Sequence, residues 1–273
     1  MKSKLVEALG LQTHAVALTW ADTAPDEAIR FKPGRWGCVV AAVATVAAKG
    51  RVAVFDRDSY GCWGGGVGLG FGNRYEVFPG GVEGFCHFLA HGNNDSEEGR
   101  RVGEQVAAWG DRHMTDDFLN GECYLKSADI SRRFVAAMPM QDIPARCVVV
   151  KPLEQIDPEH EDVKSVTLFV NPDQFSALTV LASYTDPDRE NVAVPWAAGC
   201  QVMGIFAYRE LEREHPRALV GLTDLSARVF TRASLGDKVL GFTIPWPLFL
   251  HMEENVEGSF FERRTWQQLQ GAK

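Results

Sequence analysis

The sequence lacks any long apolar run. Its longest, from Cys38 to Ala48, has eleven residues, well short of the roughly 20 that a membrane-spanning helix needs. The N-terminus shows no apolar stretch of signal-peptide length either, because Glu7 interrupts the little that is there. These absences predict a cytoplasmic protein that does not enter a membrane.

Basic residues are also scarce. The chain has 28 Lys and Arg against 36 Asp and Glu, which gives a formal net charge of −8 at pH 7. Binding to nucleic acid needs clustered Lys and Arg side chains that displace counterions from phosphate. The basic pairs here, such as Arg132-Arg133, are short and flanked by acids. We therefore expect no nucleic-acid partner.

Several catalytic and metal-binding signatures are missing as well. The sequence has no Ser-His-Asp signature, no Walker lysine loop and no metalloprotease helix, so hydrolase and kinase activities have no support. It also has no close-spaced Cys-x-x-Cys pair. Six cysteines in a chain expected in a reducing compartment favour free thiols or metal ligands over disulfides.

What the chain does contain is typical of a globular protein of one or two domains. Its 273 residues are 45% hydrophobic and 23% charged. Helix-like and strand-like segments alternate along it, which predicts an α/β (or α+β) fold.

An internal repeat is the most prominent pattern, because several features recur in the same order. Helix ends at Leu5–Gln12 and Phe134–Gln141 precede β-rich runs at Ala15–Trp20 and Cys147–Val150. The later matches are Phe31–Trp36 with Val170–Phe175, the helical Cys38–Ala48 with Ala177–Tyr184, and the strands Arg51–Phe55 with Asn191–Pro195, each strand leading to a Gly-Cys pair. Pro33 and Pro172 fall in register, where proline suits a helix start. The order predicts internally duplicated helix-strand units that form a pseudo-twofold mixed sheet.

The duplication divides the chain into three parts. Residues 1–92 form the first repeat with a glycine-rich loop, and residues 130–273 form the second repeat with a C-terminal extension. Residues 93–129 are a connector with a helix in it, whose start at Asn93–Ser96 suits a turn and a helix cap. Cys62 and Cys200 then lie in equivalent loops beyond strand ends, where α/β sheets bind ligands.

The segment 61–92 holds eleven glycines in 32 residues. Glycine at this density lets the backbone approach a ligand closely and offers amides to an anion. Gly64, Gly65 and Gly66, with Arg57 nearby, are therefore candidates for lining a small-molecule pocket. The segment lacks the strand, helix and later acid of a dinucleotide fingerprint. A tightly turned connection under neighbouring structure is the alternative interpretation.

Four cysteines are candidate metal ligands. Cys38, Cys62 and Cys200 each follow a glycine, and Cys86 lies between Phe85 and His87. Soft thiolates are preferred ligands of iron–sulfur clusters and of zinc. The gaps between these cysteines are wide, so a site forms only if the fold brings distant segments together. A buried cysteine that packs as a small hydrophobe is the alternative for each.

Other polar residues are expected to be structural. Cys147 lies in an apolar strand and Cys123 in a polar connector, so both are left out of the site. Asp224 is expected to cap a helix. His87 and His91 are four residues apart and can share a helix face, but that helix offers no third ligand to a metal.

Long blocks of the sequence resemble the prokaryotic family catalogued as domain of unknown function 169. The blocks are KPGRWGCVVAAVATVAAKGRVAVFDRDSYGCWGGGVGLGFG, FPGGVEGFCHFL, NPDQFSALTVLASY, VPWAAGCQVMGI and GLTDLSAR. The resemblance implies a one-domain cytoplasmic protein of bacteria or archaea. It also draws attention to Cys38, Cys62, Cys86 and Cys200, which lie inside the blocks. Trp63 stands where the resemblance leads us to expect Pro.

Three functional hypotheses follow. The leading one is a metal or iron–sulfur cluster protein with a glycine-lined small-ligand pocket, redox-active through its cluster, with zinc as the alternative metal. The second is a non-enzymatic module that binds a small ligand and whose cysteines only pack. The third is a thiol enzyme that uses Cys62 or Cys200 as nucleophile. The oligomeric state is open, with a homodimer among the options.

Overall fold

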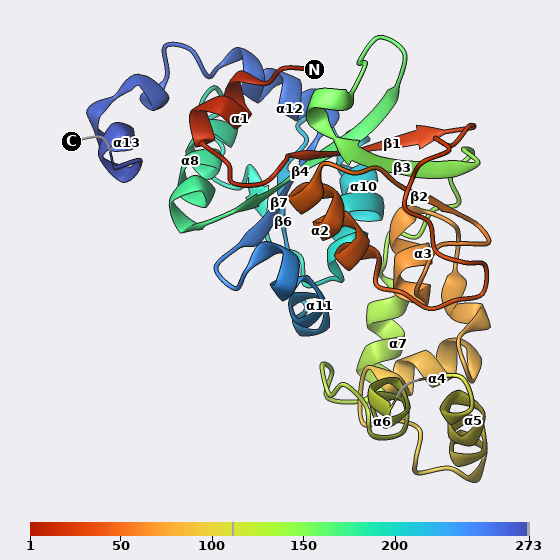
Figure 1. Cartoon of the computed structure of the whole chain (residues 1–273). Helices are drawn as coiled ribbons and strands as arrows, with labels where there is room; N and C mark the ends of the chain where they lie inside the picture. Colours follow the sequence, from red (N-terminus) through yellow and green to blue (C-terminus); the bar gives the residue numbers. More distant parts are fainter. Residues whose placement is uncertain (111, 272–273) are drawn as a thin grey trace. The chain divides into compact units, whose positions relative to one another are not determined.

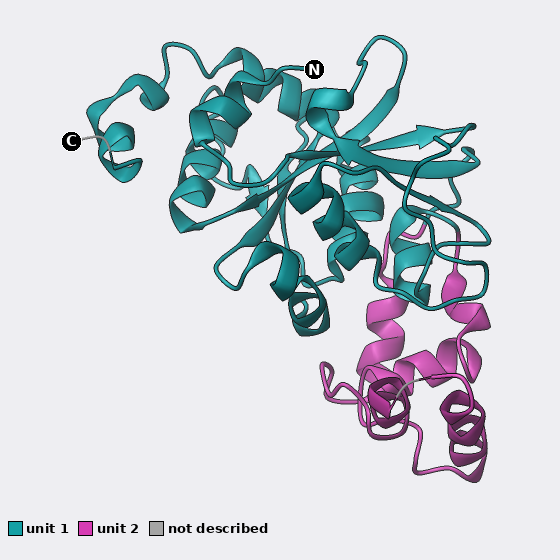
Figure 2. Cartoon of the chain, viewed as in Figure 1, with its two compact units in different colours: residues 1–71, 141–273 teal, residues 72–140 magenta. Residues whose placement is uncertain are grey.

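The computed structural model describes residues 1–110 and 112–271. The chain forms two compact units, Met1–Phe71 with Gln141–Lys273, and Gly72–Met140 (Figure 2). The repeats predicted a different division, at residues 1–92, 93–129 and 130–273. That division stays a prediction.

Seven strands of the described residues form one mixed sheet in the first unit (Figure 1). The strands are β1 (Val16–Ala21), β2 (Ala53–Asp56), β3 (Cys147–Pro152), β4 (Asp162–Val170), β5 (Val192–Ala193), β6 (Ala218–Gly221) and β7 (Leu240–Pro245). Their order is β2-β3-β1-β4-β7-β6-β5, antiparallel throughout except for the parallel pair β5 and β6. The α/β class predicted from the sequence is confirmed.

Both faces of this sheet are buried, and alternation along β4 shows how they differ. Val166, Leu168 and Val170 belong to a large apolar core on one face. The residues that alternate with them face the other way, where the Ser165 hydroxyl donates to the carbonyl oxygen of Met203 at 2.8 Å and the Thr167 hydroxyl lies 2.8 Å from that of Thr243. Successive side chains of a strand point to opposite faces, so one strand serves two cores.

Helices cover each face. The large core packs residues of α1, α8 and α12 against the sheet. The opposite face carries α2 and a continuous helical run made of α9, the π-helical turn η3 and α10, with α3 and α11 packed on them. The first-unit helices are α1 (Lys4–Leu9), α2 (Val39–Lys49), α3 (Trp63–Leu69), η2 (Leu153–Gln155), α8 (Pro172–Ala182), α9 (Gly199–Gln201), η3 (Val202–Phe206), α10 (Ala207–Leu211), α11 (Leu225–Leu235), α12 (Trp246–Glu254), η4 (Phe260–Glu262) and α13 (Arg264–Leu269).

The two prolines of the proposed repeat have different roles. Pro172 is the first residue of α8, after Asn171, whose side chain forms a capping box with Gln174. This is where proline costs least, because the first helical amides have no intrahelical partner. Pro33 lies in a turn instead, several residues before α2 begins at Val39. The expectation that both prolines begin a helix is therefore wrong for Pro33.

The internal duplication itself stays a prediction. The strands that it pairs, β2 and β5, lie at opposite edges of the sheet. However, β2 pairs antiparallel with β3 while β5 pairs parallel with β6. The two edges are therefore built differently.

The second unit is helical in its described residues. It contains η1 (Arg74–Val77), α4 (Gly81–Phe88), α5 (Glu97–Ala107), α6 (Arg112–Asn120) and α7 (Ala128–Ala136). Ser96 caps α5 by accepting from the Gly99 amide at 2.9 Å, as the turn-and-cap pattern predicted. The glycine-rich stretch is not the predicted loop, since α3, η1 and α4 occupy most of it.

No helix in the described part of the chain is long and apolar enough to cross a membrane.

Candidate functional site

Four helices of the first unit begin at residues that lie close together. Cys38 is the N-cap of α2 and Cys62 is the N-cap of α3. Cys200 lies in the first turn of α9, and Asp224 is the N-cap of α11. Besides burial, Asp224 contributes to the raised pKa of all three thiols, and Cys62 contributes to that of Cys38 and Cys200. We call the three thiols and this carboxylate the thiol cluster.

Glycines let the first two thiols approach each other. Gly61, which precedes Cys62, has φ +80, and a Cβ there would lie 2.5 Å from the carbonyl oxygen of Gly37, which precedes Cys38. A Cβ on Gly37 would lie 2.1 Å from the ring of Phe31. Real Cβ atoms do not approach other heavy atoms so closely, so glycine is required for the two loops to meet. The Gly-Cys pairs of the sequence thus have a steric reason.

The sulfur of Cys62 accepts backbone hydrogen bonds from two helices. The Gly65 amide in α3 donates to it at 3.2 Å. The Val39 amide, at the start of α2, also donates to it. Both amides belong to the first turn of a helix, where backbone N–H groups have no intrahelical acceptor. Cys62 therefore joins the starts of α2 and α3.

Cys200 lies deepest in the cluster, with its side chain buried and its thiol donating to the Gly64 carbonyl oxygen at 3.4 Å. Close packing of α3 on the run α9–η3 places it there. A Cβ on Gly68 would lie 2.8 Å from the Cys200 backbone, and a Cβ on Gly204 would lie 2.0 Å from the Gly68 carbonyl oxygen. Two facing glycines thus bring the backbones into contact.

Asp224 fixes the start of α9 against α11. One carboxylate oxygen accepts from the Gly199 amide at 2.8 Å and the other from the Ala227 amide at 2.6 Å. Both oxygens are therefore occupied by backbone donors, and the capping role expected for Asp224 is confirmed. Burial raises the pKa of this carboxyl.

Burial also raises the pKa of all three thiols. The pKa of Cys38 rises to about 12 because of burial and then because of Cys62. Burial raises the pKa of Cys62. The pKa of Cys200 rises well above its usual value through burial, followed by the neighbouring Cys62, Cys38 and Asp224. Without a cation the three thiols are protonated at neutral pH, since each thiolate would repel the others in a poorly solvated site.

The remaining predicted metal ligand, Cys86, belongs to the second unit. It is buried in α4, and the causes that shift its pKa are burial, Glu83 and Arg132, all within that unit. The structure brings three of the four candidate cysteines together, and the role of Cys86 stays a prediction.

The predicted pocket residues have structural contacts in the first unit. Gly65 and Gly66 are buried in α3, and Gly64 is half-buried. A Cβ on Gly65 would lie 2.4 Å from the Val39 side chain. The Arg57 guanidinium donates to the Asp142 carboxylate at 2.8 Å and to the Ile143 carbonyl oxygen at 2.6 Å. These residues therefore have structural roles, and ligand binding by them stays a prediction.

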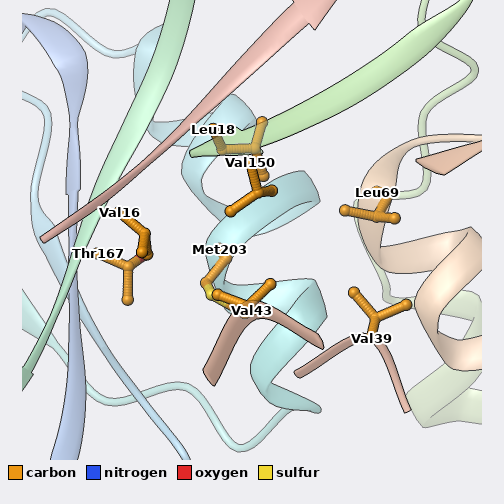
Figure 3. A pocket seen from close by; sticks show the side chains of 8 residues that line it. All are labelled: Val16, Leu18, Val39, Val43, Leu69, Val150, Thr167 and Met203. Carbon is orange, nitrogen blue, oxygen red and sulfur yellow. The ribbon is translucent and has the colours of Figure 1, made fainter. Parts of the chain in front are cut away.

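A small apolar cavity is lined by side chains of the sheet and of the helices packed on it (Figure 3). Its volume is ≈ 10 Å³, about the space of one water molecule. Its walls are Val16, Leu18, Val39, Val43, Leu69, Val150, Thr167 and Met203. Val39 and Leu69 come from the helices that Cys38 and Cys62 cap, so the cavity adjoins the cluster without being the predicted glycine-lined pocket.

In the part of the chain that the structure describes, no group of three or more His, Cys, Asp or Glu side chains is arranged to hold a metal ion. The position of Asp224 beside the thiols was not predicted from the sequence. Its helix-cap pattern was visible, but only the fold shows which helix starts lie together.

Comparison with known proteins identifies the family alone. Residues 4–255 match the family domain of unknown function 169, which is described as uncharacterised ArCR. No curated protein and no solved structure matches the chain.

Proposed function

The chain belongs to the domain of unknown function 169 family, and we propose that this member holds an iron–sulfur cluster or a related metal centre on Cys38, Cys62 and Cys200. The observation that carries the proposal is the convergence of three thiols from distant segments at the starts of helices α2, α3 and α9.

The backbone donors around the sulfurs support this function. The Cys38 sulfur has the Val40 and Ala41 amides beside it, and the Cys62 sulfur has the Gly65 and Val39 amides. A neutral thiol is a weak hydrogen-bond acceptor, whereas a thiolate is a strong one. Amides near the sulfurs therefore suit the charged form that binds metal, and hydrogen bonds to sulfur also tune the potential of a cluster.

The charges in the thiol cluster also support a bound metal. Forming three thiolates beside Asp224 without a cation is unfavourable, and the raised pKa values of the thiols express that cost. A bound metal reverses it, because a coordinated thiol is deprotonated outright. Metal binding thus requires the loss of the thiol protons and the closing of the sulfurs around the metal.

We favour a cluster over a single zinc ion. Each iron of a cluster takes its own thiolates, so the protein ligands need not converge on one point. Three thiolates leave one iron position open, which suits binding of a small ligand or a fourth thiolate. The proposal includes a redox role for the cluster and a location in the cytoplasm, where free thiols persist.

The test is elemental analysis of protein purified without oxygen. We expect visible absorption together with iron and acid-labile sulfide, and a loss of most of the iron in Cys62→Ser and Cys200→Ser. Cys147→Ser is the matched control, because Cys147 is a buried thiol of β3 that donates to the Ala21 carbonyl oxygen outside the cluster. It should keep the iron content of the wild type.

Two results decide between the proposal and its alternative. Colourless, metal-free wild-type protein that refuses iron and sulfide on reconstitution would overturn the metal function and favour a ligand-binding module with structural cysteines. Equal iron in the wild type and in Cys62→Ser would exclude this set of ligands.

Cys86→Ser tests the fourth predicted ligand separately. Loss of iron in this variant would add Cys86 to the three thiols, while retention would leave the fourth position open to a small ligand.

A further inference from the structure

A second thiol site lies in the second unit, where two loop segments run side by side. The segment after α6 is tied to the end of α4 by three backbone hydrogen bonds, from Glu122 to Phe88, from Cys123 to Ala90 and from Leu125 to Leu89, at 2.8 to 3.0 Å. A Cβ on Gly121 would lie 2.1 Å from the Ala90 carbonyl oxygen. The backbones are in direct contact, so the position of Cys123 is fixed.

Cys123 has an unusual backbone conformation for its residue type. Its φ is +52, in the left-handed region, and its side chain is exposed. A residue with a Cβ avoids this region at a free energy cost, and such residues often mark functional sites.

His91 faces this thiol in a defined tautomer. Its Nε2 lies 2.8 Å from the Lys126 carbonyl oxygen, which can only accept, so Nε2 carries the proton. Nδ1 therefore has a free lone pair, and it lies 3.9 Å from the Cys123 sulfur. The other acceptor near this sulfur is the Asn120 carbonyl oxygen at 4.0 Å. A nucleophile, a base and a group that orients the base are thus present, at the looser spacing common in ligand-free sites.

We propose that Cys123 and His91 form a nucleophilic pair that undergoes thiol–disulfide exchange with small disulfides. His91 Nδ1 takes the thiol proton, and the thiolate attacks one sulfur of the disulfide. The new bond joins Cys123 to that sulfur, the disulfide bond breaks, and the departing thiolate takes the proton from the imidazolium. Charged neighbours in the chain are Glu122 and Lys126, and Asp117 of α6 precedes them.

The mixed disulfide is expected to persist. The other cysteine of this unit, Cys86, is buried in α4 and its pKa is raised, first by burial. A protonated, buried thiol does not attack a disulfide. The site is therefore suited to reversible modification by a small thiol and is independent of the metal site proposed for the first unit.

The experiment follows the reaction of the native protein with dithiobis(nitrobenzoate) at pH 7, a disulfide that releases a coloured thiolate. One of the six thiols should react in a fast phase, and Cys123→Ser should remove that phase. His91→Gln, whose amide can still donate to the Lys126 carbonyl oxygen, should slow it by about tenfold or more, because the base is lost. His87→Gln, which changes the histidine four residues earlier, is the control and should leave the rate of the fast phase unchanged.

Reaction in denaturant supplies a reference that needs no variant. Native Cys123 should react faster than the same thiol in the unfolded chain, although unfolding exposes it fully. A fast phase that survives Cys123→Ser, an unchanged rate in His91→Gln, or a native rate below the unfolded rate would each overturn the proposal. Mass spectrometry after treatment with oxidised glutathione should place the adduct on Cys123.

Discussion

Cysteine has opposite environments in the two units of this chain. In the thiol cluster, Cys38, Cys62 and Cys200 are protonated and at least partly buried at helix starts, and the sulfurs of Cys62 and Cys200 are hydrogen-bonded to backbone. In the second unit, Cys123 is exposed on a left-handed loop position beside His91. Buried, protonated thiols react slowly with dissolved electrophiles, and thiols grouped together suit a bound cation. The exposed Cys123, in contrast, is a nucleophile that dissolved reagents can reach. Burial and neighbours, rather than residue type, decide which chemistry a thiol supports.

The largest expected effect concerns the close packing of α3 on the run α9–η3 beside the thiol cluster. Gly204→Ala places a Cβ 2.0 Å from the Gly68 carbonyl oxygen, and backbone atoms cannot move aside as a flexible side chain can. We expect a loss of about 3 kcal/mol in the free energy of unfolding, measured by urea denaturation. Gly258→Ala, in open space at φ +75, should cost only the left-handed strain of about 1 kcal/mol. Equal losses in the two variants would contradict the close contact between Gly204 and Gly68.

The next largest effect concerns alkaline pH in the metal-free protein. The pKa of Cys38 is raised in the fold to about 12 from an ordinary value of 9.0. Its contribution to stability is therefore complete below pH 9 and is lost as the pH rises towards 12. In this range, each pH unit lowers the free energy of unfolding by about 1.4 kcal/mol per thiol. The wild type should therefore lose roughly 2 kcal/mol more of its free energy of unfolding between pH 9 and 11 than Cys38→Ser does. Parallel stability curves for the variant and the wild type would contradict the raised pKa.

A smaller effect tests how Asp224 holds the cluster. Asp224→Ala removes the acceptor of both the Gly199 and the Ala227 amides, which should cost about 2 kcal/mol. Asp224→Asn keeps one acceptor and a good helix cap, so it should cost about 1 kcal/mol. If the two variants unfold at the same urea concentration, the bond to Gly199 does not contribute.

The smallest effect separates the second site from the first. Cys123→Gly relieves a φ of +52, which costs a side-chain-bearing residue roughly 1–2 kcal/mol. The greater freedom of glycine in the unfolded chain offsets about 0.5–1 kcal/mol of this gain. We therefore expect a rise of about 0.5 kcal/mol in the free energy of unfolding, with no change in Cys123→Ser. A loss of stability in Cys123→Gly would mean that the thiol itself holds the loop.

Local patterns in the sequence predicted local structure well. The caps at Ser96 and Asp224 follow from side chains that accept from nearby amides. The helix after Cys38 follows from its run of small apolar residues. The glycine-rich stretch was misread as a loop, because glycine is unfavourable in an isolated helix. In the folded chain α3 forms all the same, since close packing at Gly65 and Gly68 leaves no room for side chains.

The sequence by itself determined the α/β class, the helix caps and the four cysteines that merit attention, because these depend on residue type and on short spacings. Only the tertiary structure decided that Cys38, Cys62 and Cys200 lie together with Asp224 while Cys86 belongs to another unit. It also placed Cys123, which the sequence analysis set aside, next to His91. Contacts between residues far apart in the chain depend on how the sheet and its helices pack, and no local pattern encodes them.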